Sequence, residues 1–385
     1  MTRKFIVFIF CFFLWGNGFV MAQEVKDGMG QAKLPDGSIY EGEFNNGLFN
    51  GKGTLTSANG DKFVGEFKDG LMNGKGIATT AMGDKVEGEY KNGRLNGMGI
   101  AIQANGKHEG QFKDGYPNGQ GILTYVTGDK FEGEFKNGYL NGEGIMTGER
   151  GQYKGQFKNN LMDGEGIFID SNGSQFKGNF KAGKLEGKAT IFLMNGDKYE
   201  GNVKNFQPDG KGTYTYTSGG KYEGEFKGGA MHGNGILKYA DGKQYEGEFK
   251  DNQMGGYGTF TYPNGDKYQG YFNGGELNGK SSVLYSKGDK YDGDLKNSVL
   301  HGQGTLTYAG GDKYTGEFRN GKIDGKGSFQ YSNGEKYEGD FKNNKFDGQG
   351  TLTCSDGKQI RGEFKNWKSL DGDGCKERSG NTRVK

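Results

Sequence analysis

The sequence predicts an all-β fold, an elongated single-layer antiparallel meander of tandem β-hairpin repeats. Three observations lead to this prediction. A glycine recurs at a nearly fixed period, the residues around it alternate between apolar and charged side chains, and Asn-Gly pairs follow at regular intervals. The 385 residues include 78 glycines and only 31% hydrophobic residues, which is too little apolar material for two or three ordinary globular cores.

The period is defined by the glycine of a recurring Glu-Gly-Glu-Phe-like tetrad. Twelve of its fourteen spacings are 23 residues and two are 22. A period this strict predicts one array of about fifteen 23-residue units over residues 42–374. We expect residues 23–41 to form a partial repeat that caps the array, and residues 375–385 to form a basic tail. The tetrad glycines are Gly42, Gly65, Gly88, Gly110, Gly133, Gly155, Gly178, Gly201, Gly224, Gly247, Gly270, Gly293, Gly316, Gly339 and Gly362.

Each unit is expected to contain two strands. Residues 221–227 read Lys-Tyr-Glu-Gly-Glu-Phe-Lys, and this alternation predicts a strand with one apolar and one charged face. A second strand is expected over residues 304–308, where Leu306 and Tyr308 are two residues apart and so lie on the same face. Asn-Gly pairs at 59–60, 264–265 and 333–334 predict the turns to the next unit, because both residues tolerate positive φ. Two strands per unit, each about 4.8 Å from the next, would extend fifteen units to roughly 140 Å.

The glycine within the first strand needs a physical reason, because glycine weakens a strand. Tyr222 and Phe226 flank Gly224 on one face, so we expect an aromatic ring to lie over the bare glycine backbone. The charged side chains of the other face are expected to pair across strands. Such exposed pairs contribute little to stability, so this face would mainly confer solubility.

The first 22 residues differ from the rest of the chain. Arg3 and Lys4 precede an apolar run that starts at Phe5, and the segment ends with small residues before Ala22. This pattern predicts a cleaved signal peptide and an exported protein that is periplasmic, at the cell surface or extracellular. The alternative is an uncleaved anchor, for which the apolar run is short, because a bilayer span needs about 20 residues.

Cleavage after Ala22 would leave a chain with no net charge. It removes Arg3 and Lys4 from the 50 basic residues and none of the 48 acidic residues. This balance argues against nucleic acid as a partner. Cys354 and Cys375 would be the remaining cysteines, and they form either one disulfide at the C-terminal end or two free thiols.

No residue pattern predicts catalysis or cofactor binding. Residues 274–281 match the phosphate-binding pattern G-x-x-x-x-G-K-S, but they lie on an ordinary repeat turn and lack the required strand and helix around them. His108, His232 and His301 have neither metal-ligand nor triad spacing, and we expect each to be a solvated variant of a repeat position. The sequence therefore predicts no enzyme, no cofactor and no metal site.

The units resemble the MORN repeat family, whose signature runs Tyr-x-Gly-x-Phe/Tyr, a short turn, then Gly-x-Gly-x-Leu/Tyr. Residues 245–249 match the first half, and Gly256, Gly258 and Tyr262 match the second. The resemblance spans about residues 26–374. It implies an extended hairpin array that acts as a scaffold, often self-associates and contacts membranes or phospholipids in some accounts.

Several units depart from the signature. His108 occupies an aromatic position, Val203 and Leu295 occupy the Phe position, and Ala189 and Ser281 occupy a glycine position. We expect these departures to change local geometry and not the fold.

The leading functional hypothesis is a non-catalytic exported scaffold that binds a protein partner or a second copy of itself, as a homodimer. A single-layer sheet leaves an apolar face and two terminal edges to be covered. The alternative is a surface that binds membrane phospholipid or glycan, although zero net charge disfavours purely electrostatic lipid binding. The candidate interaction residues are Tyr222, Phe226, Tyr245, Phe249, Tyr268, Phe272, Tyr314, Phe318, Tyr337 and Phe341.

Overall fold

The computed structural model describes residues 26–371 and 374–375, and its regular elements are all β-strands. The expected signal peptide at 1–22 lies outside the described residues, as does the expected tail beyond Cys375. The 31 strands belong to one antiparallel sheet, so the predicted hairpin meander is confirmed. The chain divides into two compact units, which we describe one at a time.

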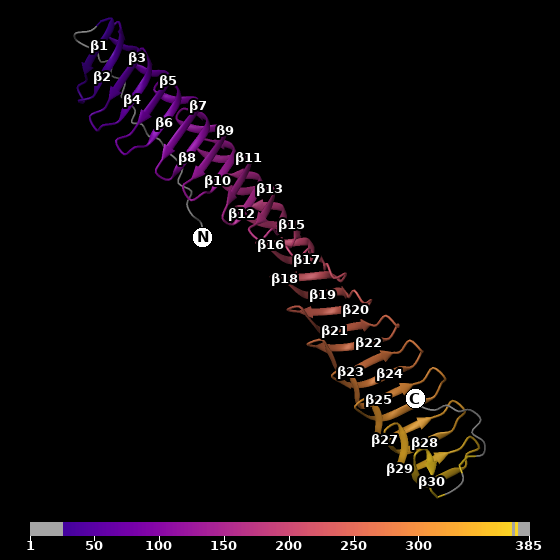
Figure 1. Ribbon diagram of the computed structural model, residues 1–385. Coiled ribbons are helices and arrows are strands. Elements are labelled where there is room, and N and C mark those ends of the chain that lie inside the picture. The colour runs from indigo at the N-terminus through magenta and orange to yellow at the C-terminus, as the bar shows by residue number, and fades with distance from the viewer. Residues whose placement is uncertain (1–25, 372–373, 376–385) are drawn as a thin grey trace. The chain divides into compact units, whose positions relative to one another are not determined.

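The first unit comprises residues up to 194, together with 203–206. Its strands follow the chain order, and each strand from β2 to β14 pairs with the strands before and after it (Figure 1). The strands are β1 (Gly28–Lys33), β2 (Ile39–Asn45), β3 (Leu48–Thr56), β4 (Lys62–Lys68), β5 (Leu71–Thr79), β6 (Lys85–Lys91), β7 (Arg94–Gln103), β8 (Gly106–Lys113), β9 (Tyr116–Tyr125), β10 (Lys130–Lys136), β11 (Tyr139–Gly148), β12 (Gly151–Lys158), β13 (Leu161–Asp170), β14 (Gln175–Lys181) and β15 (Lys184–Phe192).

The second unit comprises residues 195–202 and residues from 207 onward, so β16 (Lys198–Lys204) contributes to both units. From β17 to β31 the pairing again follows the chain order. The strands are β17 (Gln207–Thr215), β18 (Lys221–Lys227), β19 (Ala230–Lys238), β20 (Gln244–Lys250), β21 (Gln253–Thr261), β22 (Lys267–Asn273), β23 (Glu276–Leu284), β24 (Lys290–Lys296), β25 (Val299–Thr307), β26 (Lys313–Arg319), β27 (Lys322–Gln330), β28 (Lys336–Lys342), β29 (Lys345–Thr353), β30 (Gln359–Lys365) and β31 (Lys368–Ser369).

A two-residue turn joins the two strands of each hairpin, and here both central residues have positive φ. Between β2 and β3 these are Asn46 and Gly47, with φ of 51° and 76°. This is the turn type whose twist matches that of the flanking strands. The Gly47 N–H donates to the carbonyl of Lys26, so the tip of the hairpin is also bonded to the preceding segment.

In most repeats a three-residue turn leads from one hairpin to the next, whereas two residues suffice between β7 and β8 and between β11 and β12. The predicted Asn-Gly pairs do lie in three-residue turns, but the expectation that both of their residues have positive φ was wrong. In the turn after β3, Gly60 has a φ of 91° and its N–H donates to the Ser57 carbonyl, whereas Asn59 keeps an ordinary negative φ. The Asn59 side chain instead accepts a hydrogen bond from the Asp61 N–H at 3.1 Å. Only the glycine needs the left-handed region, because asparagine acts through its side chain here.

The second strand is longer than the sequence predicted, because it includes a β-bulge. β25 begins at Val299 and not at Gly304, and Tyr308 lies in the following turn. In β2 and β3, Gly42 pairs with Gly53 but Glu43 pairs with Asn50, which leaves two extra residues in β3. A bulge of this kind bends the strand locally.

The acidic residue that directly follows the tetrad glycine stabilises this bulge. The Glu43 carboxylate accepts a hydrogen bond from the Lys52 N–H at 3.0 Å, and the Asp340 carboxylate accepts one from the Gln349 N–H at 3.0 Å. The acids of this position therefore hold backbone geometry and do more than confer solubility. Ion pairs on the outer face form within one strand, as between Lys221 and Glu223 at 3.3 Å, and across strands, as between Lys280 and Asp294 at 3.0 Å.

Glycines from neighbouring strands lie opposite one another and form a glycine row across each unit, interrupted at Ala189 in the first unit and at Ser281 in the second. Gly247 pairs with Gly235 on one side and with Gly258 on the other. The ring of Tyr245 lies over this row, and a methyl group added to Gly258 would lie 2.4 Å from the tyrosine Oη. The expected covering of glycine by an aromatic ring is confirmed. The ring of Tyr245 comes from the strand of Gly247, β20, and also covers Gly258 of the adjacent strand β21.

The covering tyrosine also makes a specific hydrogen bond. Its hydroxyl donates to the carbonyl three residues later, at the bulge, where the ladder register changes. Eight repeats share this bond, at distances of 2.6 to 3.1 Å. The donors are Tyr40, Tyr153, Tyr199, Tyr222, Tyr245, Tyr291, Tyr314 and Tyr337. Packing and hydrogen bonding thus fix the same ring.

The two departures in the glycine row change the local geometry, as expected. Ala189 and Ser281 place a side chain where the ring would lie, and Leu185 and Leu277 come within 3.1 Å of the methyl positions of the facing glycines. Phe176 is consequently left only partly buried. Tyr268 is displaced in the same way.

Candidate functional site

The ten side chains predicted to form an interaction surface lie mainly in the core. Nine of them are at most 6% exposed, and Tyr268 is half-buried. Tyr222, for example, packs edge-on against Phe226 of its own strand, with centroids 5.0 Å apart, and against Phe249 of the next repeat at 4.9 Å. These rings stabilise the array and leave little area for a partner. The sequence showed which residues share a face, but not that the bent hairpins bury that face.

A different set of aromatic residues lies at the surface of the second unit, and we call it the tyrosine row. Each member is the first residue of a three-residue turn, where its N–H donates to the carbonyl four residues later and its own carbonyl accepts from the turn glycine. The same position in the first unit holds one tyrosine, Tyr125, and smaller or acidic residues such as Ser57, Thr80 and Asp170. The row is Tyr216, Tyr239, Tyr262, Tyr285, Tyr308 and Tyr331.

The rings of the tyrosine row lie at the border of the core. Tyr239 is 37% exposed and Tyr262 is 38% exposed, and the other four members are half-buried. Tyr262 packs against Phe260 with centroids 5.0 Å apart, and Tyr331 packs against Phe329 at 4.7 Å. The second strand thus supports one side of these two rings and leaves them partly exposed.

The row is enlarged where Ser281 interrupts the glycine row. The displaced Tyr268 lies between two members of the tyrosine row, with its centroid 5.4 Å from Tyr262 and 6.4 Å from Tyr285. Three tyrosine rings therefore follow one another at this place. Sequence reasoning noted the serine but had no signal for where the displaced ring would go.

Carboxylates alternate with the tyrosines of the row. The Asp266 carboxylate accepts a hydrogen bond from the Ser286 N–H of the next turn at 2.7 Å, and this bond lowers the pKa of Asp266. Burial, followed by the neighbouring Tyr268 and Asp266, raises the pKa of Tyr285 to about 12. At neutral pH the row therefore combines neutral hydroxyl groups with ionised carboxylates.

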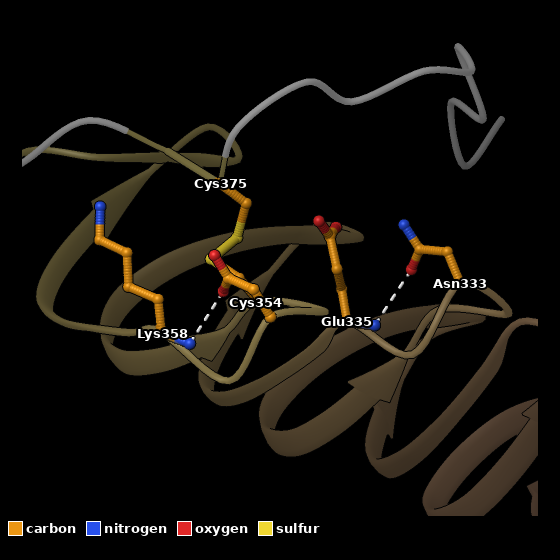
Figure 2. The surroundings of a disulfide bond; sticks show 6 residues. Asn333, Glu335, Cys354, Lys358 and Cys375 are labelled. Atoms are coloured by element: carbon orange, nitrogen blue, oxygen red, sulfur yellow. Dashed lines mark hydrogen bonds between the residues drawn. A yellow bond between two sulfur atoms is a disulfide. The ribbon is translucent and has the colours of Figure 1, made fainter.

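The seventh position in this series is not a tyrosine but Cys354, which is joined to Cys375 in a disulfide (Figure 2). Cys354 is buried at the start of the last three-residue turn, where its N–H donates to the Lys358 carbonyl. Ahead of the disulfide, the Asp371 carboxylate accepts from the Glu363 N–H at 3.1 Å. The C-terminal segment is thus fastened to the last repeat by a covalent bond and by hydrogen bonds to β30.

Other sequence motifs lie on ordinary repeat elements. Gly274 and Gly275 form the two-residue turn after β22, and residues 276–281 of the phosphate-binding pattern belong to β23. Within residues 26–371 and 374–375, no three His, Cys, Asp or Glu side chains cluster as metal ligands would. The same residues contain no helix that is long and apolar enough to cross a membrane.

His108 is buried, which corrects the expectation that all three histidines are solvated. Its side chain is 1% exposed and occupies the place of the covering tyrosine, with Phe112 and Phe135 packed edge-on at 5.1 and 4.7 Å. Neither ring nitrogen has a hydrogen-bond partner among the described residues. His232 and His301 are half-buried at bulge positions of their second strands.

The family comparison agrees with the repeat period. The family model described as "MORN repeat" matches thirteen segments between residues 40 and 359. It leaves out residues 268–290, which include Ser281 and the displaced Tyr268. The comparison with curated proteins finds no match.

Solved structures show only weak similarity. The TCP10 domain of CPAP from Danio rerio has 12% identity and a TM-score of 0.30, with 51% of this chain and 99% of that chain covered. A G-box domain of the microcephaly protein CPAP has 15% identity and a TM-score of 0.22, covering 52% and 100%. A streptogramin B lyase has 10% identity and a TM-score of 0.12, covering 90% and 86%. Scores this low support no functional transfer.

We predict that His108 makes the array sensitive to acid. Burial lowers the pKa of His108 from 6.5 to about 4, whereas the nearby Glu109 raises it less. As the pH falls, His108 is therefore protonated in the unfolded chain before it is protonated in the folded chain. The stability that His108 contributes is complete above pH 6.5 and is lost as the pH falls to about 4, by roughly 3 kcal/mol at most.

Urea unfolding at pH 7.0 and pH 4.5 tests this prediction. H108Y and H108F should both show a smaller loss of stability in acid than the natural chain. H108Y should in addition be more stable than H108F by about 1 kcal/mol at both pH values, because its hydroxyl regains the hydrogen bond to the bulge. An equal acid loss in all three proteins would contradict the assignment.

Proposed function

This chain belongs to the MORN repeat family, and from that premise we propose that it is a non-catalytic exported scaffold that holds a protein partner on its tyrosine row. The observation that carries the proposal is the repetition of one half-exposed tyrosine at the same turn position in six consecutive hairpins. Repeat arrays present extended surfaces of this kind. Tyrosine suits such a surface because its ring is apolar and its hydroxyl forms hydrogen bonds.

The proposal of a non-catalytic role rests on the structural work that the recurrent polar groups already do. Acids of the Glu43 position hold the bulge, and acids of the Asp266 position hold the next turn. Tyrosines of the Tyr245 position bond the backbone. In this proposal these residues maintain the array repeat after repeat, and the half-exposed row contacts the partner.

A protein partner is favoured over lipid and over a second copy of the chain. The turns that carry the row from residue 239 to residue 335 contain five acidic residues and two lysines, an excess of negative charge that disfavours anionic membranes. A two-fold dimer through the same surface would place these acids against each other, which is unfavourable.

Export is the second part of the proposal. The signal-like pattern ending at Ala22 motivates it, and the Cys354–Cys375 disulfide supports it, because disulfides persist in oxidising compartments. We predict that intact-mass analysis of the chain from its native host will show loss of residues 1–22 and a mass about 2 Da below that of the dithiol. A full-length or fully reduced chain would contradict export.

Selection from a peptide-display library tests the binding role. We expect residues 23–385 to enrich peptides whose binding falls at least about tenfold in the variant Y239S/Y262S/Y285S, because aromatic residues carry most interface energy. The matched control is Y257S/Y271S, which removes two tyrosines that are 48% and 64% exposed on the opposite face of the sheet. Enriched peptides that bind the row variant and the natural chain equally well would refute the proposal.

A further inference from the structure

We propose that the tyrosine row binds a basic, proline-rich segment in the polyproline II conformation, centred on Tyr262, Tyr268 and Tyr285. This inference rests on the proposed function and identifies the chemistry of the partner. Its starting point is the one repeat of the row that breaks the glycine pattern. Ser281 displaces Tyr268 from its place in the core, and the displaced ring joins the row. Departures from a regular pattern without an evident structural gain are places to look for function.

The spacing of the row matches the pitch of polyproline II. Consecutive members are separated by two strands, which places them about 9.6 Å apart. A polyproline II helix rises 3.1 Å per residue with three residues per turn, so it advances about 9.3 Å per turn. One face of such a segment therefore presents an equivalent residue to each successive tyrosine. The mismatch is a few tenths of an ångström per repeat and stays small over the three or four turns from Tyr239 to Tyr308.

The rings offer the contacts that such a segment needs. Tyr239 and Tyr262 expose part of a ring while a phenylalanine, Phe260, packs against both at 6.2 and 5.0 Å. Ring positions are thus fixed before binding, which reduces the entropy lost on association. Polyproline II has no internal hydrogen bonds, so its carbonyls can accept from tyrosine hydroxyls. Proline-rich segments dock on aromatic-lined surfaces by this combination.

The charge near the row favours a basic segment. Asp266 and Asp289 are half-buried and flank Tyr285 along the repeat direction. Each accepts a backbone hydrogen bond from the next turn, at 2.7 Å for Asp266 and 2.9 Å for Asp289, so each carboxylate is held in place. Two lysines belong to the same group of turns. Lys243 is paired with Asp241 at 2.8 Å, and Lys287 lies near Asp266.

Further along the row, Asp312 and Glu335 occupy the same turn position and are buried. The turns that begin at Tyr308 and Tyr331 thus contain one acid each and no lysine. An arginine or lysine between prolines would meet the half-buried carboxylates of Asp266 and Asp289 in two successive repeats, and a charged hydrogen bond of this kind is stronger than a neutral one.

Calorimetric titration of residues 23–385 with three synthetic peptides tests the inference. The probe is four copies of Arg-Pro-Pro, and the comparison peptides replace its prolines by alanine or its arginines by glutamate. We expect the probe to bind, and each comparison peptide to bind at least about tenfold more weakly, because one loses the preformed helix and the other loses the charge. Equal binding of the alanine peptide would show charge attraction alone and overturn the inference.

Variants locate the site. S281G lets Tyr268 return to the core and is expected to weaken probe binding at least about tenfold. Its matched control, S282A, changes the adjacent serine and should bind as the natural chain does. Unchanged probe binding in S281G would remove Tyr268 from the site. Circular dichroism melting of both variants checks that the fold is retained.

The outcomes separate this inference from the proposed function. If display peptides bind the row but the Arg-Pro-Pro probe does not, the inference fails and the scaffold proposal stands. If neither binds and the row variant behaves as the natural chain, both fail. A cello-oligosaccharide tested in parallel that binds the row while the probe does not would also overturn the inference, because it would assign the rings to a glycan.

Discussion

The packing of a tyrosine ring over a row of glycines is the interaction on which the rest of this structure depends. A single-layer sheet has no second layer to bury its apolar face. The glycine row lets a ring such as Tyr245 lie against bare backbone, where a side chain on Gly258 would exclude it. The same ring packs against phenylalanines of its own and the next repeat and donates a hydrogen bond at the bulge. One residue thus links strand, bulge and neighbouring repeat.

This interaction also explains which glycines can change. A methyl group on the first-strand glycine Gly247 would lie 2.5 Å from the Gly258 backbone, whereas the atoms nearest to one on Gly258 belong to the Tyr245 ring. Backbone cannot move aside as easily as a side chain. Both departures in the chain, Ala189 and Ser281, are accordingly at second-strand positions. The second of them supplies the additional ring of the tyrosine row.

Much of this architecture could be predicted from the sequence, because the period of two and the repeat of 23 are direct signatures of hairpins. The location of the accessible surface could not. The alternation of residues along the strand shows that Tyr222 and Phe226 share a face. It carries no information on the bulge that bends the hairpin over that face. The turn at Asn59-Gly60 was placed correctly, but the backbone conformation of Asn59 was misassigned for a related reason. The dipeptide fits two turn geometries, and the loop length that selects between them follows from strand pairing.

His108 was misplaced because a histidine in an aromatic position can be either solvated or buried, and only packing decides.

A double-mutant cycle in the repeat of Tyr245 tests the central claim most directly. The variants are G258A, Y245V and their combination, and hydrogen exchange of the peptide that covers residues 245–261 measures local stability. Valine is a natural occupant of the tyrosine position at Val86. If the ring over glycine organises the repeat, G258A costs about 2 kcal/mol in the natural chain and less than about 0.5 kcal/mol when Tyr245 is already valine. An equal cost in both backgrounds would show that the glycine is required by the backbone alone and would contradict the account.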